Sequence, residues 1–474
     1  MLNTTLTFSK DLIDELECII MEPGRFMQVG IYQKDWEKSK NLLEKIKPVS
    51  IIIMGNEFNN LSELRRLLHD IRDLYLNSMK IREPLIAIDQ EGGNVVRLKE
   101  LSYSPGNFAL SRLNNTNFSY YSGMITGYEL KELGFHWDLA PVVDVMNNSD
   151  NYIVMERSFG SDVLKVAEYA SLFTKGLQEY GISATGKHFP GHGSVLEDSH
   201  SYLPIDKRSK FSIENTMYPF IKIMNDGIKS IMMSHIIYEA FDNNKPASLS
   251  EKWYQYVRKF LGYNGVIITD SLDMKAISNN FTPEEIAHDA FTGGADILEC
   301  VDPDLALEIH EYLMKVENEN KNRIERIESL YLNPTSNVRP PSEIMEWISV
   351  SAPMWFRKVI LDKNKNIAVV NLLPYKYIND VIEDIKGKLA ELGLSIKDDL
   401  SKADQLIIIG KNLHITGKQS QIYEICNGKR CIYINTGVPV DIGLINDPIG
   451  YISAGGEKEE NILASIYSAL GFYL

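Results

Sequence analysis

Histidine, lysine and aspartate are concentrated in one short stretch of this chain. Residues 187–200 read K-H-F-P-G-H-G-S-V-L-E-D-S-H and contain three of the nine histidines. Pro190 lacks a backbone N–H, and Gly191 and Gly193 disfavour a helix, so we expect a shaped loop here. The apolar-rich residues 181–186 before it read as a short strand. A loop held by a rigid element is a common place for catalytic groups.

Three kinds of chemistry fit these side chains. The histidines could simply pack the loop and form local hydrogen bonds. They could also bind a metal ion, for which the candidate ligands are His188, His192, Asp198 and His200. Proline and glycine between His188 and His192 exclude presentation from one helix, however, and no cysteine lies nearby. In the third interpretation Asp198 and His200 form an acid/base dyad, in which the carboxylate orients the imidazole and raises its basicity. We favour this dyad, with no metal and no cofactor.

The elements that must position these residues are indicated by a regular alternation of apolar runs and amphipathic segments. The apolar runs cover residues 26–30, 50–54, 85–89, 135–141, 183–188, 229–235, 265–270 and 295–300. Continuous apolar strands that alternate with helices are typical of a parallel sheet buried on both faces. Eight such units predict a (β/α)₈ TIM-type barrel.

Most of these predicted strands end on a polar or ionisable residue. The strand-end residues are Asp89, Asp138, Lys187-His188, His235 and Asp270. The C-terminal ends of barrel strands converge on one face, where active sites lie. A single residue of this kind could be a helix cap, but five together predict a site at the mouth of the barrel.

A second, smaller domain follows the barrel. Residues 333–341 (N-P-T-S-N-V-R-P-P) have the composition of a linker. Further apolar runs cover residues 367–372, 405–410, 431–436 and 449–454. We therefore predict a catalytic barrel domain over residues 1–332, a linker over 333–350 and an α/β sandwich domain over 351–474. The second domain has no phosphate-binding glycine motif, so no nucleotide is expected.

Four motifs carry a resemblance to a known family. Residues 187–200 resemble the catalytic loop of glycoside hydrolase family 3 in its N-acetyl-β-glucosaminidase branch, which reads K-H-F-P-G-H-G followed by D-x-H. Residues 89–97 (D-Q-E-G-G-N-V-V-R) are similar to the family's D-Q-E-G-G-R-V-x-R, with Asn94 in place of the first arginine. Residues 157–162 resemble its R-S-F-G-x-D, and the apolar run at 265–270 ends in the T-D of its nucleophile strand.

The resemblance implies a retaining exo-β-N-acetylglucosaminidase (β-N-acetylhexosaminidase) in which Asp270 is the nucleophile. His200, tuned by Asp198, would be the acid/base. The sugar-binding residues that it implies are Asp89, Arg97, Arg157, Lys187 and His188. The implied substrate is a small carbohydrate from imported cell wall (peptidoglycan), N-acetylglucosamine linked to anhydro-N-acetylmuramic acid.

Other functions fit the same fold. A β-glucosidase of this family would lack the D-x-H loop, so the intact loop argues against it. A phosphorylase remains open, because a histidine acid/base repels phosphate less than a carboxylate does. A catalytically silent sugar-binding protein would be expected to lose Asp270 or the Asp198/His200 pair, and all three residues are present.

Composition restricts the partners. The chain has 474 residues, of which 44% are hydrophobic and 24% charged, as in an ordinary globular protein. A net charge of −15 argues against nucleic acid or an anionic membrane as partner. No secretory signal and no apolar run of the ~20 residues that span a membrane are visible. The four cysteines are scattered without a disulfide framework, which suggests a reducing compartment. We expect a cytoplasmic monomer.

Overall fold

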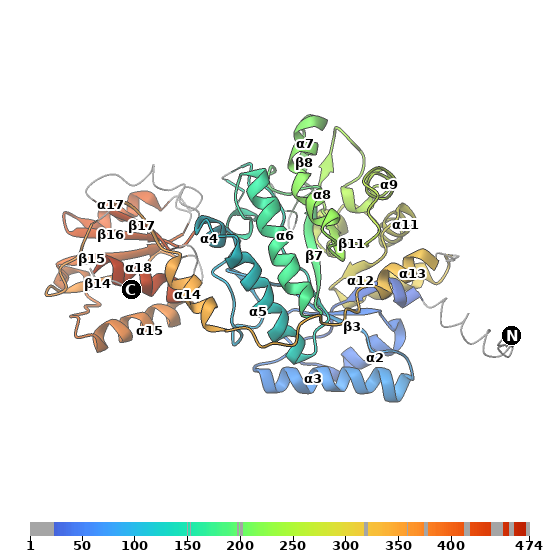
Figure 1. Ribbon diagram of the computed structural model, residues 1–474, viewed down its shortest axis with the longest axis horizontal. Helices are drawn as coiled ribbons and strands as arrows, with labels where there is room; N and C mark the ends of the chain where they lie inside the picture. The colour runs from blue at the N-terminus through green and yellow to red at the C-terminus, as the bar shows by residue number, and fades with distance from the viewer. Residues whose placement is uncertain are drawn as a thin grey trace.

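The computed structural model describes residues 23–148, 150–151, 153–196, 199, 202–316, 321–357, 359–373, 378–411, 418–437, 449–454 and 459–470. A larger body, blue through yellow in Figure 1, is built from the N-terminal two thirds of the chain. A smaller orange-to-red body, formed by the C-terminal residues, lies beside it.

Eight parallel strands form the centre of the larger body. In chain order they are β1 (Met27–Val29), β2 (Ser50–Ile53), β3 (Leu85–Ile88), β6 (Trp137–Asp138), β7 (Ser183–Phe189), β9 (Ser230–Met233), β11 (Val266–Thr269) and β12 (Leu298–Cys300). From β1 to β11 each of these strands pairs with the next one in the chain, and β1 also pairs with β12. A bridge between Ile268 and Ile297 joins β11 to the segment that leads into β12. The predicted eight-stranded barrel is thereby confirmed, and every strand overlaps the apolar run that predicted it.

Helices cover the outside of the barrel. They are α2 (Trp36–Ile46), α3 (Leu61–Asp73), α4 (Asn107–Arg112), α5 (Asn117–Leu133), α6 (Val163–Glu179), α7 (Lys210–Thr216), α8 (Tyr218–Asn225), α9 (Glu251–Gln255), α10 (Lys275–Ser278), α11 (Pro283–Gly293), α12 (Pro303–Leu313) and α13 (Lys321–Glu328). Helices α5 and α6 lie side by side (Figure 1) and approach closely. A Cβ atom at Gly123 of α5 would lie 2.1 Å from the carbonyl oxygen of Phe173, and one at Gly176 of α6 would lie 2.3 Å from that of Tyr120.

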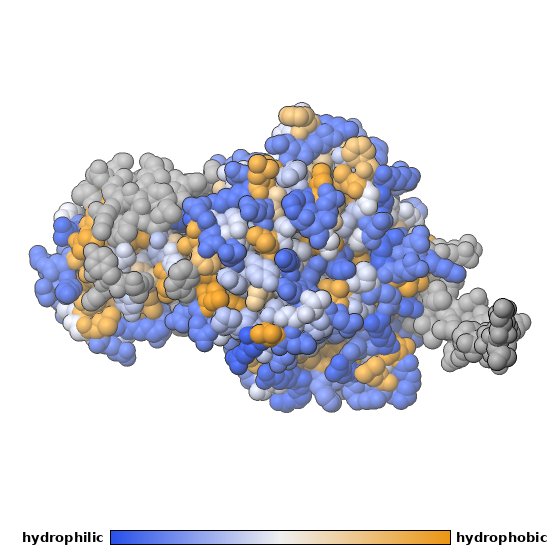
Figure 2. Space-filling model, viewed as in Figure 1, coloured by the Kyte–Doolittle hydropathy of each residue, from blue (hydrophilic) through white to orange (hydrophobic). Residues whose placement is uncertain are grey.

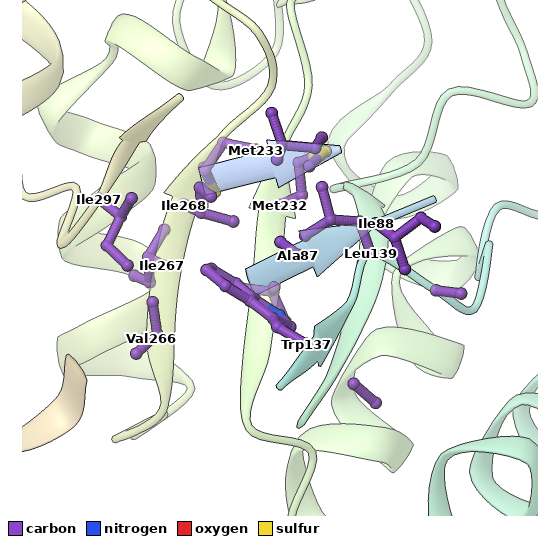
Figure 3. Close-up of a cluster of buried hydrophobic side chains, with 14 of the residues drawn as sticks. Ala87, Ile88, Trp137, Leu139, Met232, Met233, Val266, Ile267, Ile268 and Ile297 are labelled. Atoms are coloured by element: carbon purple, nitrogen blue, oxygen red, sulfur yellow. The ribbon is translucent and has the colours of Figure 1, made fainter. Parts of the chain in front are cut away.

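The apolar interior of the barrel contains a polar cluster around Trp137. Figure 3 shows this indole among side chains from β3, β9 and β11. Trp137 is fully buried, and its Nε1–H donates to Thr185 Oγ1 at 2.6 Å and to Ser230 Oγ at 3.1 Å. These bonds tie β6, β7 and β9 together inside the barrel, because each residue belongs to a different strand.

The smaller body contains a five-stranded sheet in the order β13-β17-β16-β15-β14. The strands are β13 (Met354–Arg357), β14 (Ile367–Asn371), β15 (Gln405–Gly410), β16 (Arg430–Asn435) and β17 (Gly450–Ser453). Four of them are parallel and match the predicted runs, whereas β13 is antiparallel and was not predicted. One apolar cluster packs α15 (Ile378–Glu391) and α18 (Glu459–Ala469) on one face, and another packs α17 (Gln419–Cys426) on the other. This is the predicted α/β sandwich.

A helix, α14 (Glu343–Ser351), occupies the second part of the segment for which a linker was predicted. Its residues Met345 and Ile348 belong to the apolar cluster of the barrel. On its other side, Ser349 accepts a hydrogen bond from Asn461 of α18 at 3.1 Å. The helix therefore packs against both bodies, while the domain boundaries at residues 332 and 350 stay predictions.

Two of the four cysteines are bonded to each other. Cys426 ends α17 and Cys431 lies in β16, with a disulfide between them and Cα atoms 6.1 Å apart. The expectation of unbonded, scattered cysteines is wrong for this pair. The reason is a tight reversal at Asn427 and Gly428, whose φ angles of 40° and 77° place both residues in the left-handed region. Cys300 is a buried free thiol.

The face of the molecule seen in Figure 2 is mainly hydrophilic, with scattered hydrophobic residues. Among the described helices, none combines the length and the apolar character that crossing a bilayer requires.

The Trp137 cluster leads to a stability prediction. We expect Trp137→Phe to lower the free energy of unfolding by about 1–3 kcal/mol more than Trp253→Phe, because only the first substitution removes a satisfied hydrogen-bond donor. Trp253 is also fully buried, but its Nε1 has no partner among the described residues. Urea unfolding of both variants measures the difference, and an equal or larger effect of Trp253→Phe would contradict it.

Candidate active site

A cavity of about 330 Å³ opens where the C-terminal ends of the barrel strands converge. Its apolar lining consists of Met54, Val95, Ile153, Met232, Met274 and Val301. Its polar lining consists of Asp89, Glu91, Arg97, Arg157, Lys187, His188, His192, Ser199, Asp270, Ser271, Asp273 and Glu299. This mixture suits a small ligand with many hydroxyl groups, since the polar groups offer both hydrogen-bond donors and acceptors.

Five charged side chains form an alternating row on one wall of the cavity. Lys187 Nζ lies 2.7 Å from Asp89 Oδ1 and 2.6 Å from Glu91 Oε1. Arg97 donates to the other oxygen of Asp89 at 3.2 Å. Arg157 binds both oxygens of Glu91, at 2.8 and 2.9 Å. We call this row, Arg97–Asp89–Lys187–Glu91–Arg157, the charged clamp.

Electrostatics keep the clamp fully ionised. Burial by itself raises the pKa of Asp89 and of Glu91. Lys187 and Arg97 nevertheless hold the pKa of Asp89 well below its usual range, and Arg157 and Lys187 lower the pKa of Glu91 to about 2. Burial lowers the pKa of Lys187, but Asp89 and Glu91 outweigh it and raise this pKa above its ordinary value. The wall therefore presents fixed charges of both signs.

A short hairpin brings Arg97 back to Asp89. Its strands are β4 (Gln90–Gly92) and β5 (Val95–Val96). The amide oxygen of Gln90 accepts hydrogen bonds from the backbone N–H groups of Arg97 and Leu98, at 3.0 and 3.2 Å. Gly92 turns the chain with a φ of 89°, and a Cβ there would lie 2.2 Å from Ser104 Oγ. The hairpin that begins with D-Q-E-G-G thus brings Asp89 and Arg97, eight residues apart in the chain, together as an ion pair.

The histidine loop is fixed by one buried carboxylate, Asp144. Its oxygens accept hydrogen bonds from the backbone N–H of His188 and, at 2.6 Å, from that of His192. The ring Nδ1 of His188 lies 2.8 Å from Asp144 Oδ2. Burial lowers the pKa of His192 to about 4, so this ring is neutral at pH 7. His192 Nε2 lies 3.2 Å from the hydroxyl of Ser199.

The predicted dyad, Asp198 and His200, lies outside the described residues. The residue between them, Ser199, lines the cavity, and its carbonyl oxygen accepts a hydrogen bond from the N–H of Ala276 at 3.2 Å. The roles of both dyad residues stay predictions.

Asp270 follows the last residue of β11 and lines the cavity. Its N–H donates to the carbonyl oxygen of Met233 on β9 at 3.0 Å, and its Oδ1 accepts from the N–H of Ser271 at 2.9 Å. Asp273 also reaches the cavity, where it accepts the N–H of Val301 at 2.7 Å. Of the predicted site residues, the structure brings together Asp89, Arg97, Arg157, Lys187, His188 and Asp270.

Two strand-end residues do not reach the cavity, contrary to the expectation for all five. Asp138 is fully buried beneath the hairpin and accepts the N–H of Gln90 at 2.9 Å. His235 is fully buried between Ser248 Oγ, 2.7 Å from its Nδ1, and Ser271 O, 2.9 Å from its Nε2. Loops fold over both side chains, which makes them structural.

Sequence reasoning assigned no role to three side chains at this site, Glu91, Asp144 and Glu299, and considered His192 only as a candidate metal ligand. Glu91 belongs to a motif that was identified, but no role was assigned to it. The apolar run continues past Pro141, and Asp144 is the first ionisable residue after it. A predicted strand that covered the whole run would have ended at Asp144 and indicated it as a site residue. Glu299 is the one charged residue in the last three positions of an apolar run. Within the described part of the chain, no three His, Cys, Asp or Glu side chains are grouped as a metal site.

Comparison with known proteins identifies the family to which this sequence is similar. Residues 13–330 match the profile of the Glycosyl hydrolase family 3 N terminal domain. The chain is 33% identical over 283 residues to a beta-hexosaminidase of Glaesserella parasuis serovar 5 (strain SH0165). That alignment covers 58% of this chain and 81% of the relative.

Two solved structures have similar folds. One is a glycoside hydrolase family 3 beta-N-acetylglucosaminidase from Paenibacillus sp. str. FPU-7, with a TM-score of 0.85 at 22% identity over 96% of this chain and 97% of that one. The other is NagZ from Neisseria gonorrhoeae in complex with N-trifluoroacetyl-D-glucosamine, with a TM-score of 0.60 at 26% identity over 68% of this chain and 96% of that one. At 22% identity the first supports the fold alone.

Asp138 gives a pH prediction. Burial raises its pKa from 3.8 to about 8, so between these values the folded protein keeps a proton that the unfolded chain has released. The stability contributed by this group is complete below about pH 4 and is lost as the pH rises towards 8. Asp138→Asn keeps the acceptor for Gln90 and cannot ionise. We expect the melting temperature of the variant, relative to the unmodified protein, to be higher at pH 8 than at pH 5, and a pH-independent difference would contradict this.

Proposed function

The chain belongs to glycosyl hydrolase family 3, and we propose that it is a retaining exo-β-N-acetylglucosaminidase. Its β-hexosaminidase relatives, at 30% identity or more, make it a glycoside hydrolase of that class. One observation carries the proposal further: the carboxylate of Asp270 lines the same cavity as the charged clamp. A nucleophile and a set of hydroxyl-binding groups thus face one bound sugar.

The clamp and His188 would hold the terminal sugar. Ionised Asp89 would accept hydrogen bonds from sugar hydroxyls, and Arg97, Arg157 and Lys187 would donate to their oxygens. The existing ion pairs support this role because they hold the five groups in place before a ligand arrives. Fewer side chains must then be ordered on binding, so the entropic cost of binding is smaller.

Asp270 would attack the anomeric carbon as the bond to the leaving oxygen breaks. His200, oriented by Asp198, would give its proton to that oxygen. In the second step His200 would take a proton from water, whose oxygen would form the new bond to the anomeric carbon and release Asp270. Two displacements on opposite faces return the original β configuration.

The substrate we propose is a peptidoglycan fragment in which N-acetylglucosamine is linked to anhydro-N-acetylmuramic acid. A cavity of about 330 Å³ suits a single terminal sugar rather than the interior of a chain, which favours exo cleavage. The N. gonorrhoeae structure holds an N-acylated glucosamine, which supports the same sugar here.

The first test uses p-nitrophenyl N-acetyl-β-glucosaminide. We expect hydrolysis that is faster than that of the matching β-glucoside and unchanged by added phosphate, with the β-anomer as the first product in proton NMR. An initial α-anomer would contradict the two-step mechanism. Faster cleavage of the glucoside would favour a β-glucosidase, and a sugar 1-phosphate product would favour a phosphorylase.

The second test separates the two catalytic roles. We expect Asp270→Ala to lose about 10³-fold or more of its activity on every substrate, because it lacks the covalent route. His200→Ala should lose about 10²–10⁴-fold on a natural disaccharide. Its rate of forming the glycosyl-enzyme from an activated aryl substrate should fall far less, because the aryl leaving group needs little protonation.

Azide needs no base, so it should restore aryl-substrate turnover in His200→Ala and give the β-glycosyl azide by two displacements. In Asp270→Ala, which forms no covalent intermediate, any reaction with azide should be a single displacement that gives the α-glycosyl azide. Asp138→Asn, which changes a buried carboxyl outside the cavity, serves as the matched control. Near-normal activity of Asp270→Ala, together with a His200→Ala variant that azide does not rescue, would reverse the assignment of roles.

A further inference from the structure

Glu299 is a buried acid in the wall of the cavity with no role in the mechanism described above. It lies in β12, next to the strand that leads to Asp270, and its side chain lines the cavity although the residue is only 4% exposed. Its N–H donates to Thr269 Oγ1 at 3.0 Å, and its carbonyl oxygen accepts the N–H of Leu272 at 2.9 Å. These two bonds, on either side of Asp270 in the chain, hold Glu299 close to the proposed nucleophile.

The charges that face Glu299 are mostly negative. Asp270 and Asp273 face it from the segment after β11, and Asp89 from the segment after β3. The cation that acts on it is Lys187 of β7, which is already shared between Asp89 and Glu91. Burial, followed by the charges of Asp270 and Asp89, raises the pKa of Glu299 well above its ordinary value. Burial and the neighbouring carboxylates therefore favour the neutral carboxylic acid form of this side chain.

A neutral carboxylic acid carries a proton that needs an acceptor. Among the described residues, Oε2 of Glu299 has no hydrogen-bond partner. Its register partner on β1, Gln28, has an Oε1 atom that is likewise without a partner among them. Leaving a buried donor unsatisfied costs free energy, and a ligand in the cavity can remove that cost.

We propose that Glu299 is a further substrate-binding residue, which donates a hydrogen bond from its carboxyl group to an oxygen of the terminal sugar. This inference rests on the function proposed above. A hydroxyl, the ring oxygen and the acetamide carbonyl are the available acceptors. The neutral acid suits its position, because an ionised Glu299 would add a further negative charge beside Asp270 and Asp89.

Two substitutions at this position separate donation from packing. Glu299→Gln has the same shape, stays neutral and keeps an N–H donor, so its kcat/KM should stay within about threefold of the unmodified enzyme. Glu299→Leu fills similar space without a donor, so its kcat/KM should fall about tenfold. A drop confined to the N-acetylglucosaminide, with the glucoside unaffected, would identify the acetamide carbonyl as the acceptor. An equal drop on both substrates would identify a hydroxyl or the ring oxygen.

The pH profile adds a readout that a packing role would not change. In the unmodified enzyme, ionisation of Glu299 at alkaline pH removes the donor, so kcat/KM should fall there, and Glu299→Gln should lack that decline. Gln28→Leu is the matched control, because it changes a buried polar side chain of the same layer that does not line the cavity. We expect it to alter the melting temperature without altering kcat/KM.

Activity of Glu299→Leu equal to that of the unmodified enzyme would overturn the inference, as would a folded Glu299→Gln variant as impaired as Glu299→Leu. Failure of the proposed function is distinguishable, since it would appear as absence of turnover by the unmodified enzyme. In that case, titration of N-acetylglucosamine into the unmodified, Gln and Leu proteins tests the same hydrogen bond by binding, and an equal Kd for all three would overturn it.

Discussion

The shared ion pair of Lys187 with Asp89 and Glu91 is the interaction on which the rest of the site depends. Lys187 is 3% exposed, so its charge has lost nearly all contact with bulk water. A buried ammonium group is tolerated only when it is paired and hydrogen-bonded. The two carboxylates meet this requirement at 2.7 and 2.6 Å, and each of them also binds an arginine. Strand β7, the hairpin after β3 and the arginine of η3 (Met155–Arg157) are thereby fixed relative to one another.

Carboxyl groups in and around this cavity have opposite protonation states, and the number of nearby cations decides which state each adopts. Glu91 contacts two cations, and its pKa falls to about 2. Among the described residues Asp138 accepts a hydrogen bond only from a backbone N–H, and burial raises its pKa to about 8. Glu299 faces three carboxylates, and its pKa is also raised. One residue type can therefore act as a fixed anion at one position and as a hydrogen-bond donor at another.

The C-terminal body contacts the barrel close to the clamp. Lys411, which follows β15, pairs with Glu156 at 2.5 Å, and Glu156 immediately precedes Arg157. Asn94 of the hairpin donates to the same carboxylate at 3.3 Å. Arg112 of α4 donates to Ser453 of β17 at 2.5 Å. Asn94, the position at which the D-Q-E-G-G motif departs from the family pattern, thus takes part in a polar cluster that reaches the second body.

The sequence by itself determined the barrel, because a strand buried on both faces is a continuous apolar run. Such a run can be recognised in the sequence without knowing which strand it pairs with. It also determined that Asp89, Lys187, His188 and Asp270 share a cavity, since parallel strands in a barrel bring their C-terminal ends to one face. Only the tertiary structure decided which strand-end residues reach that cavity. Asp138 and His235 have the same local pattern as Asp270, but long-range loops cover them. The same long-range packing placed cations beside Glu91 and carboxylates beside Glu299, and it is this unequal pairing of buried charges that sets the protonation state of each acid.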